Sequence, residues 1–128
     1  MDNRALILFA HGARAASWAA PFERLRELTQ ARTPGVRVSL AFLELMEPRL
    51  PALAADLAAD GVTDITVVPV FLGQGGHVLR DLPLMIDQLR TDHPQMTINV
   101  VEAAGENAAV LNALSDYCAA SLTRATPD

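Results

Sequence analysis

The hydrophobic residues of this chain alternate between two patterns. Four short apolar runs are typical of β-strands, and they cover Ala5–Ala10, Val36–Leu43, Ile65–Phe71 and Thr97–Val101. After each run, leucines and other apolar residues recur at every third or fourth position, which is the spacing of an amphipathic helix. This alternation predicts an α/β fold with a parallel sheet, right-handed crossovers and helices on both faces.

Turn and capping residues mark the ends of the first two helices. The first helix is expected over Trp18–Arg32 and stops at Pro34, because proline and glycine follow one another there. The second opens at Glu47-Pro48 and ends at Gly61. Pro69 is expected near the end of the third strand, where its missing N–H costs the sheet little.

The last two helices have weaker start signals. Asp81 is expected to cap the third helix, with Pro83 in its first turn and its end near Asp92. Asn107 caps the fourth helix, and the tail Thr123–Asp128 is expected to fray. The residues of the fourth helix that should face inward are Val110, Leu111, Leu114 and Cys118.

The chain length and the alternation together favour one doubly wound, flavodoxin-like domain over residues 1–128. The commonest small sheet of this type has the strand order 2-1-3-4. Its first and third strands are then neighbours at the point where the strand order reverses, which is where such sheets bind their ligands.

Composition narrows the classes of function. The chain is 51% hydrophobic and 20% charged, which excludes global disorder, and its net charge of −5 argues against binding to nucleic acid. Cys118 is the only cysteine and cannot form an internal disulfide. No apolar run is long enough to span a membrane or to act as a signal peptide. We therefore expect a soluble, cytoplasmic protein with neither a membrane nor a nucleic acid as partner.

Three residues that can bind a metal or carry a proton, His11, Glu44 and His77, each follow a predicted strand. The carboxyl ends of the first and third strands should bring the two histidines together. Neutral imidazole is a common metal ligand and a base near neutral pH. Glu44 is a third ligand, a base that points toward the histidines, or a charge that only complements the dipole of the next helix. His93 is expected to be structural.

Other groups near these histidines suit an anionic substrate. Arg14 and Arg80 flank them and could pair with carboxylates. Gly75 and Gly76 either cradle an anion before a helix or give flexibility to a loop that closes over a substrate.

Three blocks of this sequence together resemble the class II tetrapyrrole chelatases, in particular the CbiX/SirB group of sirohydrochlorin chelatases. The blocks are His11-Gly12-x-Arg14, Ala41-Phe42-Leu43-Glu44 followed by Pro48, and Val68-Pro69-x-Phe71-Leu72 with Gly76-His77 leading to Asp81-x-Pro83. The likeness extends from Leu6 to about Leu114. Where this chain has Ala13 and Ala15, the family often has a serine and an acidic residue.

The resemblance implies a chelatase that inserts a divalent metal into a sirohydrochlorin-like tetrapyrrole for cobalamin or siroheme synthesis. It implies His11, His77 and Glu44 as metal ligands and catalytic groups. The metal, Co²⁺, Fe²⁺ or Ni²⁺, would be a substrate, and no cofactor would be permanently bound. The residues expected to bind the tetrapyrrole are Arg14, Arg80, Gly75 and Gly76.

Two other classes of protein, a metal or tetrapyrrole carrier and a histidine phosphatase, also contain a pair of histidines of this kind. A non-catalytic carrier of metal or tetrapyrrole would keep the same histidines. A histidine phosphatase would have an arginine before its first histidine, whereas Ala10 precedes His11 here. We expect a homodimer, because a short-form chain lacks the second wall that a two-domain chelatase has. Candidate contacts, each of which could equally be core, are Met46, Phe71, Leu72, Val78 and Leu79.

Overall fold

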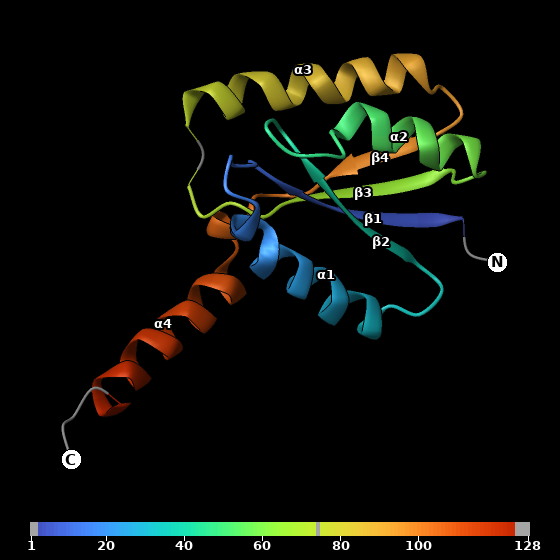
Figure 1. The fold of residues 1–128 in the computed structure, drawn as a ribbon. Coiled ribbons are helices and arrows are strands. Elements are labelled where there is room, and N and C mark those ends of the chain that lie inside the picture. Colours follow the sequence, from blue (N-terminus) through green and yellow to red (C-terminus); the bar gives the residue numbers. More distant parts are fainter. Residues whose placement is uncertain (1–2, 74, 125–128) are drawn as a thin grey trace.

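The computed structural model describes residues 3–73 and 75–124 of the 128-residue chain (Figure 1). The strands are β1 (Arg4–Ala10), β2 (Arg37–Phe42), β3 (Asp64–Pro69) and β4 (Thr97–Val100). The α-helices are α1 (Ala20–Arg32), α2 (Leu50–Ala59), α3 (Gly76–Asp92) and α4 (Ala108–Arg124). Two short 3₁₀ helices, η1 (Ala16–Ala19) and η2 (Ala104–Glu106), precede α1 and α4.

The four strands form one parallel sheet in the order β2-β1-β3-β4. The predicted fold class and strand order are therefore confirmed, with β1 and β3 adjacent at the centre. β3 ends at Pro69, which lies opposite Phe9 in the last register position of the β1–β3 pair. The missing N–H of this proline thus falls at the end of the ladder, as expected.

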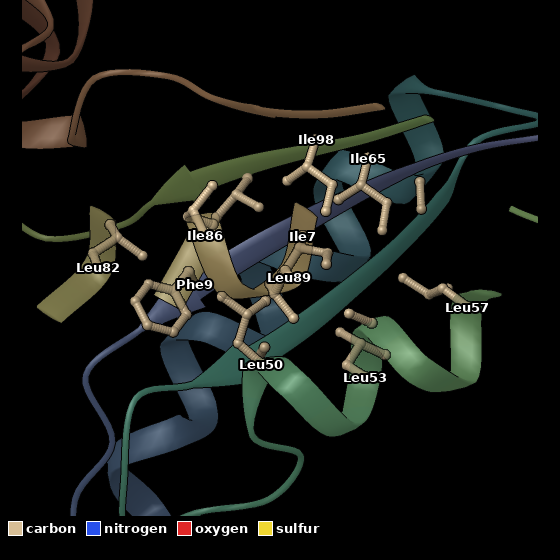
Figure 2. Packing of buried hydrophobic residues seen from close by; sticks show 14 of the residues in the cluster. Ile7, Phe9, Leu50, Leu53, Leu57, Ile65, Leu82, Ile86, Leu89 and Ile98 are labelled. Atoms are coloured by element: carbon tan, nitrogen blue, oxygen red, sulfur yellow. The ribbon is translucent and has the colours of Figure 1, made fainter. Parts of the chain in front are cut away.

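The hydrophobic core lies between the sheet and helices α2 and α3, which cover the same face (Figures 1 and 2). Ile7 and Phe9 of β1 are fully buried, and the ring of Phe9 meets the ring of Phe71 edge to face at 5.9 Å between centroids. Burying a side chain of this size stabilises the fold by roughly 1.5–3 kcal/mol. The predicted inward residues of α2, Leu50, Leu53 and Leu57, are all buried in this core.

Helix α3 begins earlier than the sequence predicts. It starts at Gly76, with Gly75 as the N-cap, so Asp81 is not the cap and Pro83 lies inside the helix. An internal proline removes one main-chain hydrogen bond. Packing outweighs that loss, because one face of α3 is buried against the sheet. The buried residues on that face are Val78, Leu82, Ile86 and Leu89.

Helix α4 is capped as predicted, but its side chains do not face inward. The Asn107 side-chain oxygen accepts hydrogen bonds from the N–H groups of Ala109 and Val110 at 3.0 and 3.2 Å. The helix then runs away from the sheet (Figure 1). Of the residues expected to be buried, Val110 is only half-buried, and Leu111, Leu114 and Cys118 are exposed. The prediction for this face was wrong, because periodicity identifies a helix face but not what covers it.

Several smaller expectations also change. The first α-helix begins at Ala20 and not at Trp18, which lies in η1. The fourth helix extends to Arg124, so residues 123 and 124 of the expected tail are helical, and residues 125–128 lie outside the described part. Phe71 and Val78, two suggested dimer contacts, are buried in the core of their own chain. In the described part of the chain, no helix is long and apolar enough to cross a membrane.

Candidate functional site

The pairing of β1 with β2 continues past the last strand residues and fixes His11 beside Glu44. The strands end with Ala10 opposite Phe42. Beyond them, the Leu43 N–H donates to the Ala10 carbonyl at 2.9 Å, and the Glu44 N–H donates to the His11 carbonyl at 3.1 Å. Both bonds are of ordinary length, so the two predicted site residues are held at adjacent positions of the carboxyl edge.

Gly12 makes this approach possible. Its φ of +96° lies in the region that side-chain-bearing residues avoid. A β-carbon at this position would lie 1.8 Å from the main-chain oxygen of Glu44, far inside contact distance. Only glycine therefore fits between the chain after His11 and the chain at Glu44. Sequence reasoning assigned no role to Gly12 apart from its place in the resemblance, although the His-Gly dipeptide was the signal available.

The imidazole of His11 is half-buried, and its Nδ1 lies 3.2 Å from the Gly12 carbonyl oxygen. A carbonyl oxygen only accepts, so this contact is a hydrogen bond when Nδ1 carries the proton. In that tautomer the lone pair is on Nε2, which can bind a metal or accept a proton. The Glu44 side chain is also half-buried, so both groups remain reachable from solvent.

The backbone of His77 lies in the first turn of α3, which follows β3. The chain leaves β3 alongside β1, because the Val70 N–H donates to the Phe9 carbonyl at 2.9 Å. The side chain of His77 lies outside the described part of the structure. Among the described residues, no group of three His, Cys, Asp or Glu side chains is placed to hold a metal ion. The meeting of His77 with His11 and Glu44 thus stays a prediction.

The expected substrate-binding residues lie on the segments that follow β1 and β3. Arg14 is exposed between β1 and η1, and Arg80 is exposed on α3. Gly75 and Gly76 form the N-terminus of α3, and a β-carbon at either glycine would meet nothing within 4 Å. The space around this helix N-terminus is therefore open, which suits a group that approaches its amides.

A small aromatic cluster supports the segment that follows His11. Trp18 of η1 stacks on Phe22 with 4.6 Å between ring centroids and lies 6.4 Å from the ring of Phe42 at the end of β2. Ala10 and Ala19 are buried in the same cluster. The cluster ties η1 to both strand ends. Trp18 therefore helps to position η1 against the ends of β1 and β2.

A four-stranded parallel α/β domain with a histidine and a glutamate fixed at adjacent strand ends matches the chelatase class that the sequence resembles. The family model CbiX matches residues 5–120. The chain belongs to the CbiX family, and the resemblance is confirmed.

Curated and solved relatives agree with this assignment. The chain is 35% identical over 82 residues to the sirohydrochlorin cobaltochelatase of Methanopyrus kandleri, covering 64% of this chain and 57% of that relative. The chain therefore spans less than two thirds of that relative's length.

Two solved structures share the fold over nearly the whole of this chain. A cobalamin (vitamin B12) biosynthesis CbiX protein from Marinobacter aquaeolei has a TM-score of 0.84 and 35% identity, covering 95% of this chain and 99% of that one. The sirohydrochlorin chelatase SirB from Bacillus subtilis subspecies spizizenii, in complex with cobalt, has a TM-score of 0.76 and 25% identity. That match covers 91% of this chain and 49% of SirB, so this chain corresponds to half of the longer protein.

Proposed function

We propose that this protein is a sirohydrochlorin metal chelatase, which inserts Co²⁺ or another divalent ion into a tetrapyrrole of cobalamin or siroheme synthesis. The observation that carries the proposal is the fixed pairing of His11 with Glu44 at the carboxyl edge of the sheet. It is supported by the Methanopyrus relative, which is named a sirohydrochlorin cobaltochelatase, and by the SirB neighbour, whose structure holds cobalt.

In this proposal His11, Glu44 and His77 hold the incoming ion. Two imidazoles and one carboxylate bind Co²⁺, Fe²⁺ or Ni²⁺ but leave coordination positions open for the pyrrole nitrogens. The ion is a substrate, so its affinity must be low enough for transfer to the macrocycle. The donor set itself does not select among these metals, because affinity follows the general divalent order.

Insertion also releases two pyrrole protons. As the metal moves to the macrocycle, an imidazole or the Glu44 carboxylate loses its metal bond and becomes available as a base. His11 suits this role because Nδ1 is placed against the Gly12 carbonyl, which orients the ring and leaves Nε2 for the metal and then for the proton.

The carboxylates of the substrate need positive partners, because the net charge of the chain is −5. We assign this role to the exposed guanidinium groups of Arg14 and Arg80. The space at the N-terminus of α3 is open around Gly75 and Gly76, and we assign the amides of this first turn to one further carboxylate.

The test is catalysis measured against the spontaneous reaction. Purified protein is mixed with sirohydrochlorin and Co²⁺, Fe²⁺ or Ni²⁺ under anaerobic conditions, and the change in the visible spectrum is followed. The proposal expects a rate well above that of metal and tetrapyrrole alone. Binding of either ligand without acceleration by any of the three metals would indicate a carrier and refute the chelatase.

We further propose that the protein acts as a homodimer and in the cytoplasm. The dimer is supported by the match to 49% of the SirB chain, because two copies would supply what the longer protein carries in one polypeptide. Solution mass by light scattering tests the dimer, and cell fractionation tests the location.

A further inference from the structure

Leu45, the residue directly after Glu44, has a left-handed backbone conformation. Its φ is +68°, and among the described residues it is the only one other than glycine with a positive φ. In this region the β-carbon of a leucine crowds the following carbonyl oxygen, so glycine is common there and leucine is rare. Residues in strained conformations of this kind cluster at functional sites, where the surrounding structure holds them in place.

Hydrogen bonds on both sides of Leu45 impose this conformation. Before it, the Glu44 N–H donates to the His11 carbonyl at 3.1 Å. After it, the chain returns to β2, because the Phe42 N–H donates to the Pro48 carbonyl at 2.9 Å. The few residues between these bonds must therefore reverse the direction of the chain, and Leu45 takes the positive φ in this turn.

Packing within the chain does not explain why a leucine stands in the turn. The next residue, Met46, packs against the cluster that contains Trp18, whereas Leu45 is 55% exposed. Glycine would suit the backbone better, and a polar residue would suit the exposed side chain better. One exposed leucine is ordinary on a protein surface, but an exposed leucine with a left-handed backbone is not. The leucine therefore contributes little to the stability of the free chain, which points to a contact with a ligand.

The turn lies at the end of the sheet where we propose that the metal is inserted. The segments that follow β1, β2 and β3 and the N-terminus of α3 all lie at this end (Figure 1). The α-carbons of Glu44 and Leu45 are about 3.8 Å apart, as in any two consecutive residues. A tetrapyrrole macrocycle is several times wider than this spacing. A macrocycle that takes the ion from Glu44 therefore comes within reach of Leu45.

A tetrapyrrole has a flat apolar ring system and a rim of carboxylates. Arg14, Arg80 and the amides of the first turn of α3 are assigned to the rim, and none of these groups is an apolar side chain. We propose that Leu45 contacts the face of the macrocycle and holds it over the bound ion. This role rests on the proposed chelatase function and adds a substrate contact to it. Because hydrogen bonds hold the turn before the substrate arrives, binding loses little entropy in ordering it.

Thermal unfolding tests the strain at Leu45 separately from the contact. In a helix or a strand, glycine is less stabilising than alanine. At this position the order should reverse, because alanine keeps the cost of the left-handed conformation and glycine does not. Leu45→Gly should therefore unfold at a Tm roughly 2–4 °C above that of Leu45→Ala. An alanine variant that is equally stable or more stable would show that the turn is not strained in solution and would overturn the proposal.

Binding of metal-free sirohydrochlorin and steady-state kinetics test the contact. Leu45→Gln keeps the size of the side chain but loses its apolar surface, so Kd and KM for sirohydrochlorin should rise at least about fivefold. The value of kcat and the affinity for Co²⁺ should stay near those of the wild type, because the contact is the same in the ground and transition states. Leu45→Met keeps an apolar side chain of similar volume and should stay within about twofold of the wild type. Leu84→Gln is the matched control, because Leu84 is 68% exposed in the middle of α3.

The possible outcomes distinguish this inference from the proposed function. A wild type that neither binds sirohydrochlorin nor accelerates insertion would refute the chelatase and this contact with it. A wild-type chelatase whose Leu45→Gln variant keeps its KM would overturn the contact alone. A lower Co²⁺ affinity of Leu45→Gln would also overturn it, because Leu45 would then act only by positioning Glu44. So would a change in solution mass by light scattering, because Leu45 would then lie in an interface between chains.

Discussion

The main-chain carbonyl of Glu44 lies directly against the α-carbon of Gly12, so closely that any β-carbon there would stand 1.8 Å from the oxygen. This contact and the hydrogen bond from the Glu44 N–H to the His11 carbonyl lock two chain segments together at the edge of the sheet. The spacing between the two backbone segments that carry these proposed ligands is therefore fixed. Because these segments are rigid, the ligands can hold a weakly bound metal ion in one geometry for transfer to the macrocycle.

Gly12→Ala should disrupt this frame. The substitution places alanine at a φ of +96° and pushes its β-carbon into the Glu44 carbonyl, so the segment must move. We expect a loss of at least about 3 kcal/mol in the free energy of unfolding, from backbone strain plus overpacking. Metal insertion should fall at least tenfold in the fraction that folds. Chemical denaturation and the spectrophotometric assay measure the two effects.

Gly61→Ala is the matched control for Gly12. Gly61 also has a positive φ, +85°, but a β-carbon there meets nothing within 4 Å. It should cost only the strain, about 1–2 kcal/mol, and leave the rate of insertion unchanged. Equal losses of stability in the two variants would show that the contact with Glu44 contributes nothing.

His11→Ala should remove metal insertion and leave the fold intact. The half-buried imidazole contacts the neighbouring Gly12 carbonyl through Nδ1, and the loss of one such hydrogen bond should change the free energy of unfolding by less than about 1 kcal/mol. The affinity for Co²⁺, measured by titration calorimetry, should fall together with the rate. His93→Ala is the control, because His93 lies at the C-terminus of α3 and its backbone contacts survive the substitution. Near-normal turnover of His11→Ala would refute the ligand assignment.

Glu44→Gln tests whether the carboxylate binds the ion or accepts a proton. The amide keeps the size of the side chain but loses its charge. A ligand role predicts weaker Co²⁺ binding, whereas a base role predicts normal binding with a slower rate. Glu47→Gln is the matched substitution nearby, and its remaining oxygen can still accept the bond from the Arg49 N–H. A Glu44→Gln variant equal to Glu47→Gln in both measurements would exclude both roles.

The sequence predicted the sheet and its functional edge well, for a physical reason. Continuous apolar runs signal strands covered on both faces, and alternation with helices leaves few topologies. His11 and Glu44 could be placed together because parallel strands end at one edge. The contact at Gly12 could not be predicted, because the spacing between two backbones depends on the register of β1 with β2.

The helices were harder to predict where tertiary packing decides. The N-cap of α3 is Gly75, which has no side chain to cap the helix, so the sequence carries no start signal there. Pro83 by itself indicates the first turn of a helix, although it lies inside α3. The burial of Leu82 and Ile86 against the sheet stabilises the helix on both sides of Pro83, in spite of the proline and of the missing cap. For α4 the apolar periodicity correctly predicts a helix. Periodicity alone, however, does not show which part of the protein packs against the apolar face of that helix.

The last prediction concerns a second glycine contact, between Gly105 of η2 and Leu72 in the segment that leads from β3 toward α3. The Gly105 N–H donates to the Phe71 carbonyl at 2.8 Å, and a β-carbon on Gly105 would lie 1.7 Å from the Leu72 carbonyl oxygen. Gly105→Ala must therefore push the chain at Leu72 away from η2. Overpacking of this kind costs about 1–3 kcal/mol, or roughly 4 °C in Tm for each kcal/mol.

The same displacement should reach function, because the segment after Leu72 carries Gly75 and His77. We expect Gly105→Ala to reduce kcat/KM for insertion at temperatures well below its Tm. Gly73→Ala is the control on that segment, since a β-carbon at Gly73 meets nothing within 4 Å. Differential scanning calorimetry and the insertion assay should separate the two variants. A Gly105→Ala protein as stable and active as Gly73→Ala would mean that η2 does not position the segment before α3.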